Sequence, residues 1–65
     1  MDDTQTARVL AVALIFNGER LDRQEIDRSE WHAEQMRLWN LAAAARVASE
    51  VFRLVAPSLA SETAG

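Results

Sequence analysis

The stretch VLAVALIF, residues 9–16, is the longest strictly apolar run in the chain, and it decides the fold class. On a helix with about 100° per residue, its larger side chains point in every direction around the axis. Interleaved alanines and leucines favour a helix over residues 4–17, begun by Asp2, Asp3 or Thr4 and ended by Asn17-Gly18. A strand is the alternative, because Val, Ile and Phe also favour sheets and Asn-Gly favours hairpin turns.

The rest of the chain also has the character of helices. Asp22 and Glu25 have the spacing of a capping box, and Leu21 and Ile26 stand where a hydrophobic staple would lie. They predict a helix from residue 22 to about residue 56, followed by a flexible tail over residues 57–65 that begins at Pro57. A second start at Asp27 or Ser29 would instead give a short helix near residues 22–29 and a longer helix after it.

The apolar face of the predicted 22–56 helix changes direction along its length. Trp31, Met36, Leu38 and Trp39 point to the side that is polar further on, where Arg46, Glu50 and Arg53 lie. The helix therefore either breaks near Asn40 or packs its two halves against different neighbours. Because no proline or glycine lies between Glu19 and Ala56, we favour two neighbours.

Size and composition indicate that the chain needs a partner. A single domain of 65 residues buries only about 60% of the surface that its unfolded form exposes. With no cysteine and one histidine, disulfides and a structural zinc site within the chain are excluded. We therefore expect an all-α helical hairpin, one domain over residues 1–65, that assembles with further copies into an oligomeric bundle. The predicted interface residues are Trp31, Met36, Leu38, Trp39, Leu10, Leu14 and Phe16.

Polar residues suggest no catalytic, cofactor or metal site. A helical metal or acid–base site places ligands three or four residues apart, whereas Ser29, Arg28 and Met36 occupy those positions around His32. No glycine-rich phosphate loop exists, since the glycines are Gly18 and Gly65. The sequence therefore predicts a non-enzymatic interaction module that serves as an adaptor, small regulator or subunit, with a second copy or another protein as its partner.

Charge argues against nucleic acid and membranes as partners. The net charge is −3, so the chain lacks the positive field that attracts phosphate backbones. The alternative function is a DNA-binding regulator of helix-turn-helix type, with a first helix from Asp22 to about Arg28 and a recognition helix after it. An apolar run of eight residues is too short to span a bilayer, and the acidic start lacks the basic region of a signal peptide. We therefore expect a cytoplasmic protein.

Overall fold

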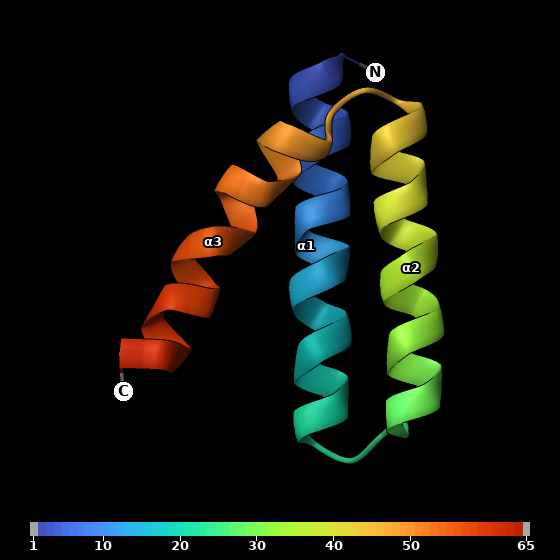
Figure 1. The fold of residues 1–65 in the computed structure, drawn as a ribbon, viewed down its shortest axis with the longest axis vertical. Helices are drawn as coiled ribbons and strands as arrows, with labels where there is room; N and C mark the ends of the chain where they lie inside the picture. The colour runs from blue at the N-terminus through green and yellow to red at the C-terminus, as the bar shows by residue number, and fades with distance from the viewer. Residues whose placement is uncertain (1, 65) are drawn as a thin grey trace.

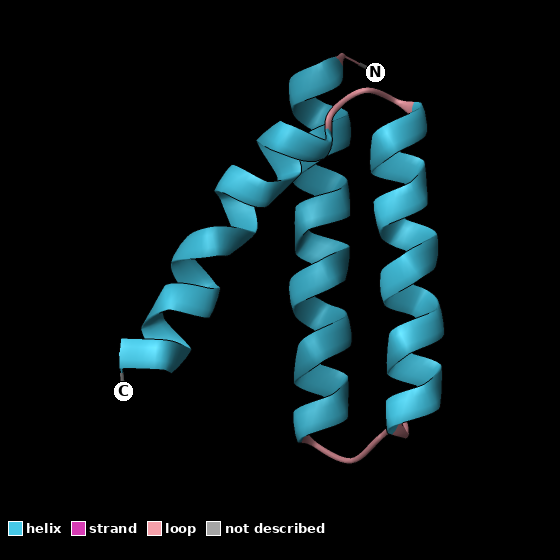
Figure 2. Ribbon diagram, viewed as in Figure 1, coloured by secondary structure: helices cyan, strands magenta, loops and turns pink. Residues whose placement is uncertain are grey.

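The computed structural model of the chain describes the backbone of residues 2–64 and the side chains of residues 2–57. In this part of the chain all regular structure is helical (Figure 2). Helix α1 spans Asp3–Asp22, α2 spans Arg28–Ala44 and α3 spans Ala48–Ala64. The all-α prediction is confirmed, and the strand alternative for residues 9–16 is wrong.

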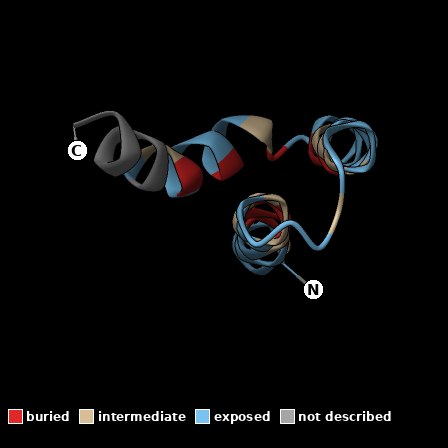
Figure 3. Cartoon of the chain, turned by 90° about the horizontal axis from the view of Figure 1, so that it is seen from below, coloured by how far each residue is buried: buried red, intermediate tan, exposed pale blue. Residues whose placement is uncertain are grey.

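Helices α1 and α2 run antiparallel and side by side, whereas α3 turns back across α1 and leads away from both (Figure 1). Seen along the first two helices, α1 lies on one side and α2 and α3 lie on the other (Figure 3). The molecule measures 33 × 26 × 15 Å, and its Cα radius of gyration is 12.0 Å. A compact chain of this length would have a radius of gyration of about 10.7 Å. The splayed α3 accounts for this open shape.

One side of α1 supplies the centre of the core. Its buried residues recur every three or four positions, as expected for one face of a helix. The core consists of Ala7, Leu10, Ala11 and Leu14 from α1, Leu38 and Ala42 from α2, and Val47, Val51 and Val55 from the segment around α3. The opposite side of α1 remains in solvent, with Val9, Val12 and Phe16 between 50% and 66% exposed. The chain therefore buries only half of its apolar run.

Helix α1 continues past the predicted stop at Asn17-Gly18. A glycine inside a helix costs about 1 kcal/mol relative to alanine, which tertiary contacts can offset. Here Asn17 is 3% exposed and donates from Nδ2 to the Trp31 carbonyl oxygen at 3.1 Å, and Leu21 is half-buried. Asn17 thus joins α1 to α2 from inside the helix, and the predicted end at residue 17 is wrong.

The helix predicted to start at Asp22 begins instead at the second candidate, Asp27. Asp27 Oδ1 accepts from the Glu30 backbone N–H at 2.8 Å, and Glu30 Oε1 accepts from the Asp27 N–H at 3.2 Å. These reciprocal bonds form a capping box. Residues 23–27 form a loop, so the short helix near residues 22–29 is absent.

Both interhelical turns use a left-handed residue that is not glycine. Gln24 and Arg46 each have φ of 61°, and no other non-glycine residue in the described part has positive φ. The N–H groups of Glu25 and Val47 donate to the carbonyl oxygens of Arg20 and Ala42, each at 2.9 Å. The N–H groups of Gln24 and Arg46 also donate, to carbonyl oxygens three residues earlier at 3.0 and 3.1 Å, and each pair of bonds forms a Schellman motif. The left-handed conformation costs a residue with a Cβ atom about 1–2 kcal/mol.

The turn at Ala45–Val47 explains the change of apolar face. A single helix over residues 22–56 is wrong, because the chain breaks there, several residues after Asn40. Leu38 and Val51 would lie roughly 140° apart on one straight helix. After the break both side chains are buried against the same helix, α1. The change of apolar face is therefore due to this break, and the favoured prediction, that the two halves of one helix pack against different neighbours, is wrong.

Helix α3 runs through Pro57 and ends at Ala64, so the predicted helix end at Pro57 is wrong. Proline removes one backbone donor, which leaves the carbonyl group of Arg53 without its usual intrahelical bond. Both residues are exposed, so water can solvate that carbonyl group. Of the predicted 57–65 tail, the side chains of residues 58–65 lie outside the described part.

We predict that Gln24→Gly raises the free energy of unfolding by about 0.5–1 kcal/mol, since glycine adopts positive φ without a steric penalty. Urea denaturation followed by circular dichroism measures this change. Ala33→Gly, at an exposed position in the interior of α2, is the matched control and should lower the free energy of unfolding by about 1 kcal/mol. Equal destabilisation by both variants would contradict the turn geometry.

Asp27→Ala should lower the free energy of unfolding by about 1 kcal/mol, because the first turn of α2 loses its cap. Asp22→Ala, at the C-terminal end of α1, removes a negative charge from the negative end of a helix dipole and should leave stability unchanged or slightly higher. The same denaturation series tests both variants. A larger loss for Asp22→Ala would restore Asp22 as the functional cap.

Candidate functional site

An open apolar cleft of about 390 Å³ lies where α3 diverges from α1 and α2. It is bordered by the C-terminal half of α1, the N-terminal half of α2 and the middle of α3. Its lining consists of Leu14, Ile15, Gly18, Glu19, Leu21, Asp22, Trp31, Gln35, Trp39, Phe52 and Val55. Three of the chain's four large aromatic rings therefore converge on one opening.

The helical register of α2 explains why both tryptophans reach the cleft. Trp31 lies seven residues, about two helical turns, before the buried Leu38 and so shares its side of the helix. Trp39 follows Leu38 directly in the sequence and packs at the edge of the core. The Trp31 ring also lies 6.5 Å from that of His32, tilted by 49°. Neither tryptophan is fully buried, so each presents part of its ring to the cleft.

Asn17 fixes the cleft's inner wall. Its side-chain amide donates a hydrogen bond to the Trp31 carbonyl oxygen, which joins α1 to α2 at Trp31. Asn17 is the buried polar residue among the described core residues. In a buried site the Asn17 amide has few other groups to which it could donate, so this hydrogen bond fixes the register of the two helices. The position of Trp31 therefore depends on Asn17.

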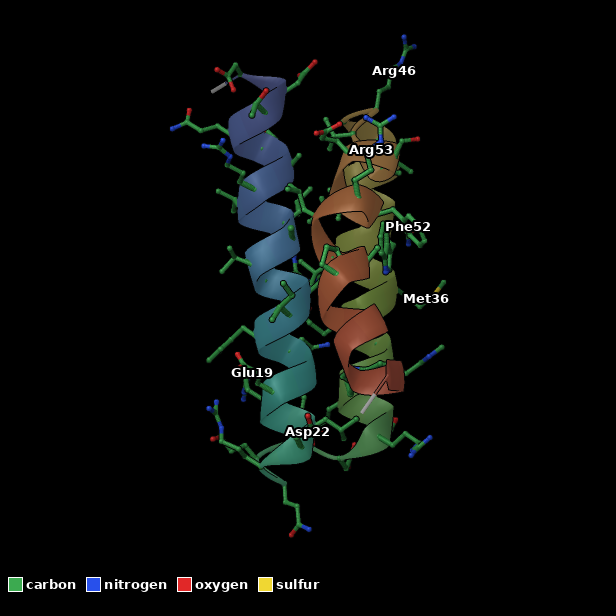
Figure 4. All side chains as sticks on the ribbon, turned by 90° about the vertical axis from the view of Figure 1, so that its left-hand side faces the viewer. Glu19, Asp22, Met36, Arg46, Phe52 and Arg53 are labelled. Atoms are coloured by element: carbon green, nitrogen blue, oxygen red, sulfur yellow. The ribbon has the colours of Figure 1, made fainter. Side chains whose placement is uncertain are left out.

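Two acidic residues that line the cleft and two arginines that do not line it lie at opposite ends of the molecule (Figure 4). Glu19 and Asp22 lie at the C-terminal end of α1, and Arg46 and Arg53 lie near the start of α3. Among the described side chains, Glu19 and Asp22 form no ion pair, and Arg53 makes a 3.4 Å contact with the exposed Glu50. Phe52 and Met36 project between these ends, on the side formed by α2 and α3.

The seven predicted interface residues divide into three groups in the structure. Leu10, Leu14 and Leu38 belong to the core of the chain itself, and Leu14 also reaches the cleft wall. Trp31 and Trp39 line the cleft. Met36 and Phe16 are each 50% exposed and lie outside it.

Phe52 is the principal cleft residue that sequence reasoning missed. It is 58% exposed, because it follows the buried Val51 directly and so points away from the core. In a single 22–56 helix it would share the apolar face with Leu41 and Val55, which concealed its exposure. The exposure of Phe52 depends on the break at Arg46, which no sequence pattern indicates.

A second apolar surface lies on the outer side of α1. We call Val9, Val12 and Phe16 the outer stripe. Its end is partly covered, because the Arg23 guanidinium lies 5.7 Å from the centre of the Phe16 ring. The residues of the outer stripe do not line the cleft between α3 and the other helices.

The charged surface shows ordinary ion pairs. Arg37 donates to both carboxylate oxygens of Glu34, at 2.6 and 2.8 Å, and this hydrogen bonding lowers the pKa of the exposed Glu34 carboxyl and raises that of Arg37. Among the described residues, no three His, Asp or Glu side chains lie close enough to hold a metal ion.

The structure does not contain the first helix of the helix-turn-helix alternative. Residues 23–27, which would supply most of that helix, form the loop between α1 and α2. Two of the nearby arginines are engaged there, since Glu25 pairs with Arg23 at 2.7 Å and with Arg20 at 3.7 Å. This segment therefore does not supply the first of the two helices that such a motif requires.

Within the described residues, none of the helices has the length and apolarity needed to cross a bilayer. Comparison of the chain with protein-family models, curated proteins and solved structures gave no match.

Asn17→Asp should lower the free energy of unfolding by roughly 1–3 kcal/mol at neutral pH, because an ionised carboxylate would face the Trp31 carbonyl oxygen. Below about pH 3.5 the introduced carboxyl is protonated and can donate to that oxygen, so most of the loss should disappear. Denaturation at both pH values measures the effect. Asn40→Asp, an exposed position on α2, is the control and should change stability little.

Proposed function

We propose that this chain is a non-enzymatic helical interaction module that associates with a second copy of itself and serves as an adaptor, small regulator or subunit. The observation that carries this proposal is the amount of apolar surface that the fold leaves in solvent. Seven large apolar side chains are at least 39% exposed: Val9, Val12, Phe16, Met36, Leu41, Phe52 and Leu54. An apolar cleft adds to them.

The size of the solvent-accessible surface of the chain also supports association. A folded monomer of 7.3 kDa is expected to expose about 4,200 Å². This chain exposes 4863 Å². The excess of roughly 700 Å² is close to the ~800 Å² that each partner buries in a protein interface of standard size.

The residues at the cleft have the composition of an interface centre. Tryptophan, phenylalanine and methionine are enriched in interfaces, and tryptophan often dominates the binding energy. Trp31, Trp39 and Phe52 surround the opening, with Met36 on the same side of the molecule. Charged groups border this region and do not occupy its middle, which is the usual arrangement of a polar rim.

The distribution of charge favours a second copy as the partner. A two-fold axis through the cleft would place Arg46 and Arg53 of one chain, with Asp3 and Glu50 near them, beside Glu19 and Asp22 of the other. Such a pairing is isologous, so one self-complementary face satisfies both chains. Opposite charges across an interface mainly set its orientation and raise the association rate.

Sedimentation equilibrium over a range of concentrations tests the proposal. The mass should rise from 7.3 kDa at high dilution toward twice that value. A mass of one chain at every concentration would refute self-association.

Phe52→Asp should weaken the dimer at least tenfold, since it places a charge among the cleft aromatics, and tenfold corresponds to about 1.4 kcal/mol. Val12→Asp, on the outer stripe and 66% exposed, is the matched control and should leave the dissociation constant within about threefold. Sedimentation of both variants measures this difference. The opposite result would move the interface to the outer stripe.

A further inference from the structure

The turn between α2 and α3 interrupts a segment whose residues favour helix. Ala42–Ala45 precede the left-handed Arg46, and Ala48 follows Val47. Alanine has the highest helix propensity of all residues, and arginine ranks close to it. Neither glycine nor proline accounts for the break. The turn is therefore maintained by the burial of α3 against α1, because its local sequence favours a continuous helix.

A helical conformation at Arg46 would join α2 and α3 into one helix over residues 28–64. Such a helix would be about 55 Å long at 1.5 Å per residue. The longest dimension of the molecule is 33 Å. Helix α3 would thus leave its own α1 entirely.

The two halves of this long helix would present their apolar residues to different sides. Leu38 and Val51 are both buried in the present fold, yet they would lie roughly 140° apart around one axis. The α1 helix of the same chain could cover the Leu38 side. Val47, Val51 and Val55 would then need the α1 helix of another chain.

The exchange would preserve the contacts that α3 makes in the closed chain. Helix α3 packs mainly against α1, and its contact with α2 is much smaller. A partner's α3 could therefore occupy the same surface of α1 with the same valines buried. Among the contacts within each unit of α1, α2 and α3, only the turn at Ala45–Val47 would differ between the two arrangements, and the exposed cleft face would remain available for contact between the two units.

We propose that two copies of this chain exchange their α3 helices, and that Arg46 sets the balance between the closed monomer and the exchanged dimer. This inference rests on the proposed self-association and specifies how the two chains are joined. Each cleft of the exchanged dimer has Trp31 and Trp39 from one chain and Phe52 and Val55 from the other. The complete aromatic cleft then belongs to the pair.

The test uses two substitutions that change the preference of residue 46 for the left-handed conformation in opposite directions. Arg46→Gly favours the left-handed turn and disfavours a continuous helix, so it should raise the dimer dissociation constant at least tenfold. Arg46→Ile disfavours positive φ strongly and should lower that constant at least tenfold. Gln24→Gly is the matched control, because it makes the same kind of change at the turn that exchange leaves intact. It should leave the constant within about threefold.

A distance measurement within one chain identifies the exchange directly. The chain contains no cysteine, so Ser29→Cys with Ala56→Cys provides two unique sites for spin labels. Doubly labelled protein is diluted into an excess of unlabelled protein, so that the measured distances lie within single chains. A straight helix separates the two Cα atoms by about 40 Å, which exceeds the length of the closed molecule. This population should increase with concentration, increase further in Arg46→Ile and vanish in Arg46→Gly.

The outcomes separate the two proposals. A dimer with only the short distance, and with the wild-type dissociation constant in both Arg46 variants, overturns the exchange and leaves self-association standing. A single-chain mass for the wild type and for Arg46→Ile at every concentration overturns both. Circular dichroism verifies that Arg46→Ile is folded. If that variant does not fold, an unchanged dissociation constant in Arg46→Gly by itself overturns the exchange.

Discussion

Both α2 and α3 depend on the same apolar surface of α1 for their burial. Leu10 and Leu14, with alanines between them, give that surface enough width to contact two helices that do not contact each other extensively. Alanine permits this close approach because its side chain ends at Cβ. Every other feature follows from the sharing of α1: the open cleft, the divergence of α3 and the strained turn that brings α3 back.

Helix content was predictable from the sequence, because apolar periodicity reports which residues share a face. The helix ends were harder to predict, since several capping signals compete. Asp22 and Asp27 both have an acidic residue three positions later, and local spacing alone does not rank them. In the structure α1 continues past Gly18, so Asp22 lies inside its last turn, and a hydrogen bond from Asn17 to the Trp31 carbonyl oxygen joins α1 to α2. Such a contact between distant residues is invisible to local patterns.

The candidate site was predictable in part for a related reason. Trp31 and Trp39 were identified from their residue type and spacing, and they line the cleft. Leu10 and Leu38 were assigned to an interface because the number of neighbours within the chain was underestimated, and the structure buries them in its own core. Phe52 was missed because its orientation depends on the break at Arg46, where a residue without special turn propensity adopts positive φ. Sequence rules for turns rely on glycine and asparagine, so they give no signal at this position.

The order of the helices along the chain has a consequence for folding. Helices α1 and α2 are joined by a loop of only five residues, so they can pair before α3 docks. Until α3 docks, the surface of α1 that receives Val51 and Val55 is uncovered. At high protein concentration, α3 of a neighbouring chain can therefore reach that surface first.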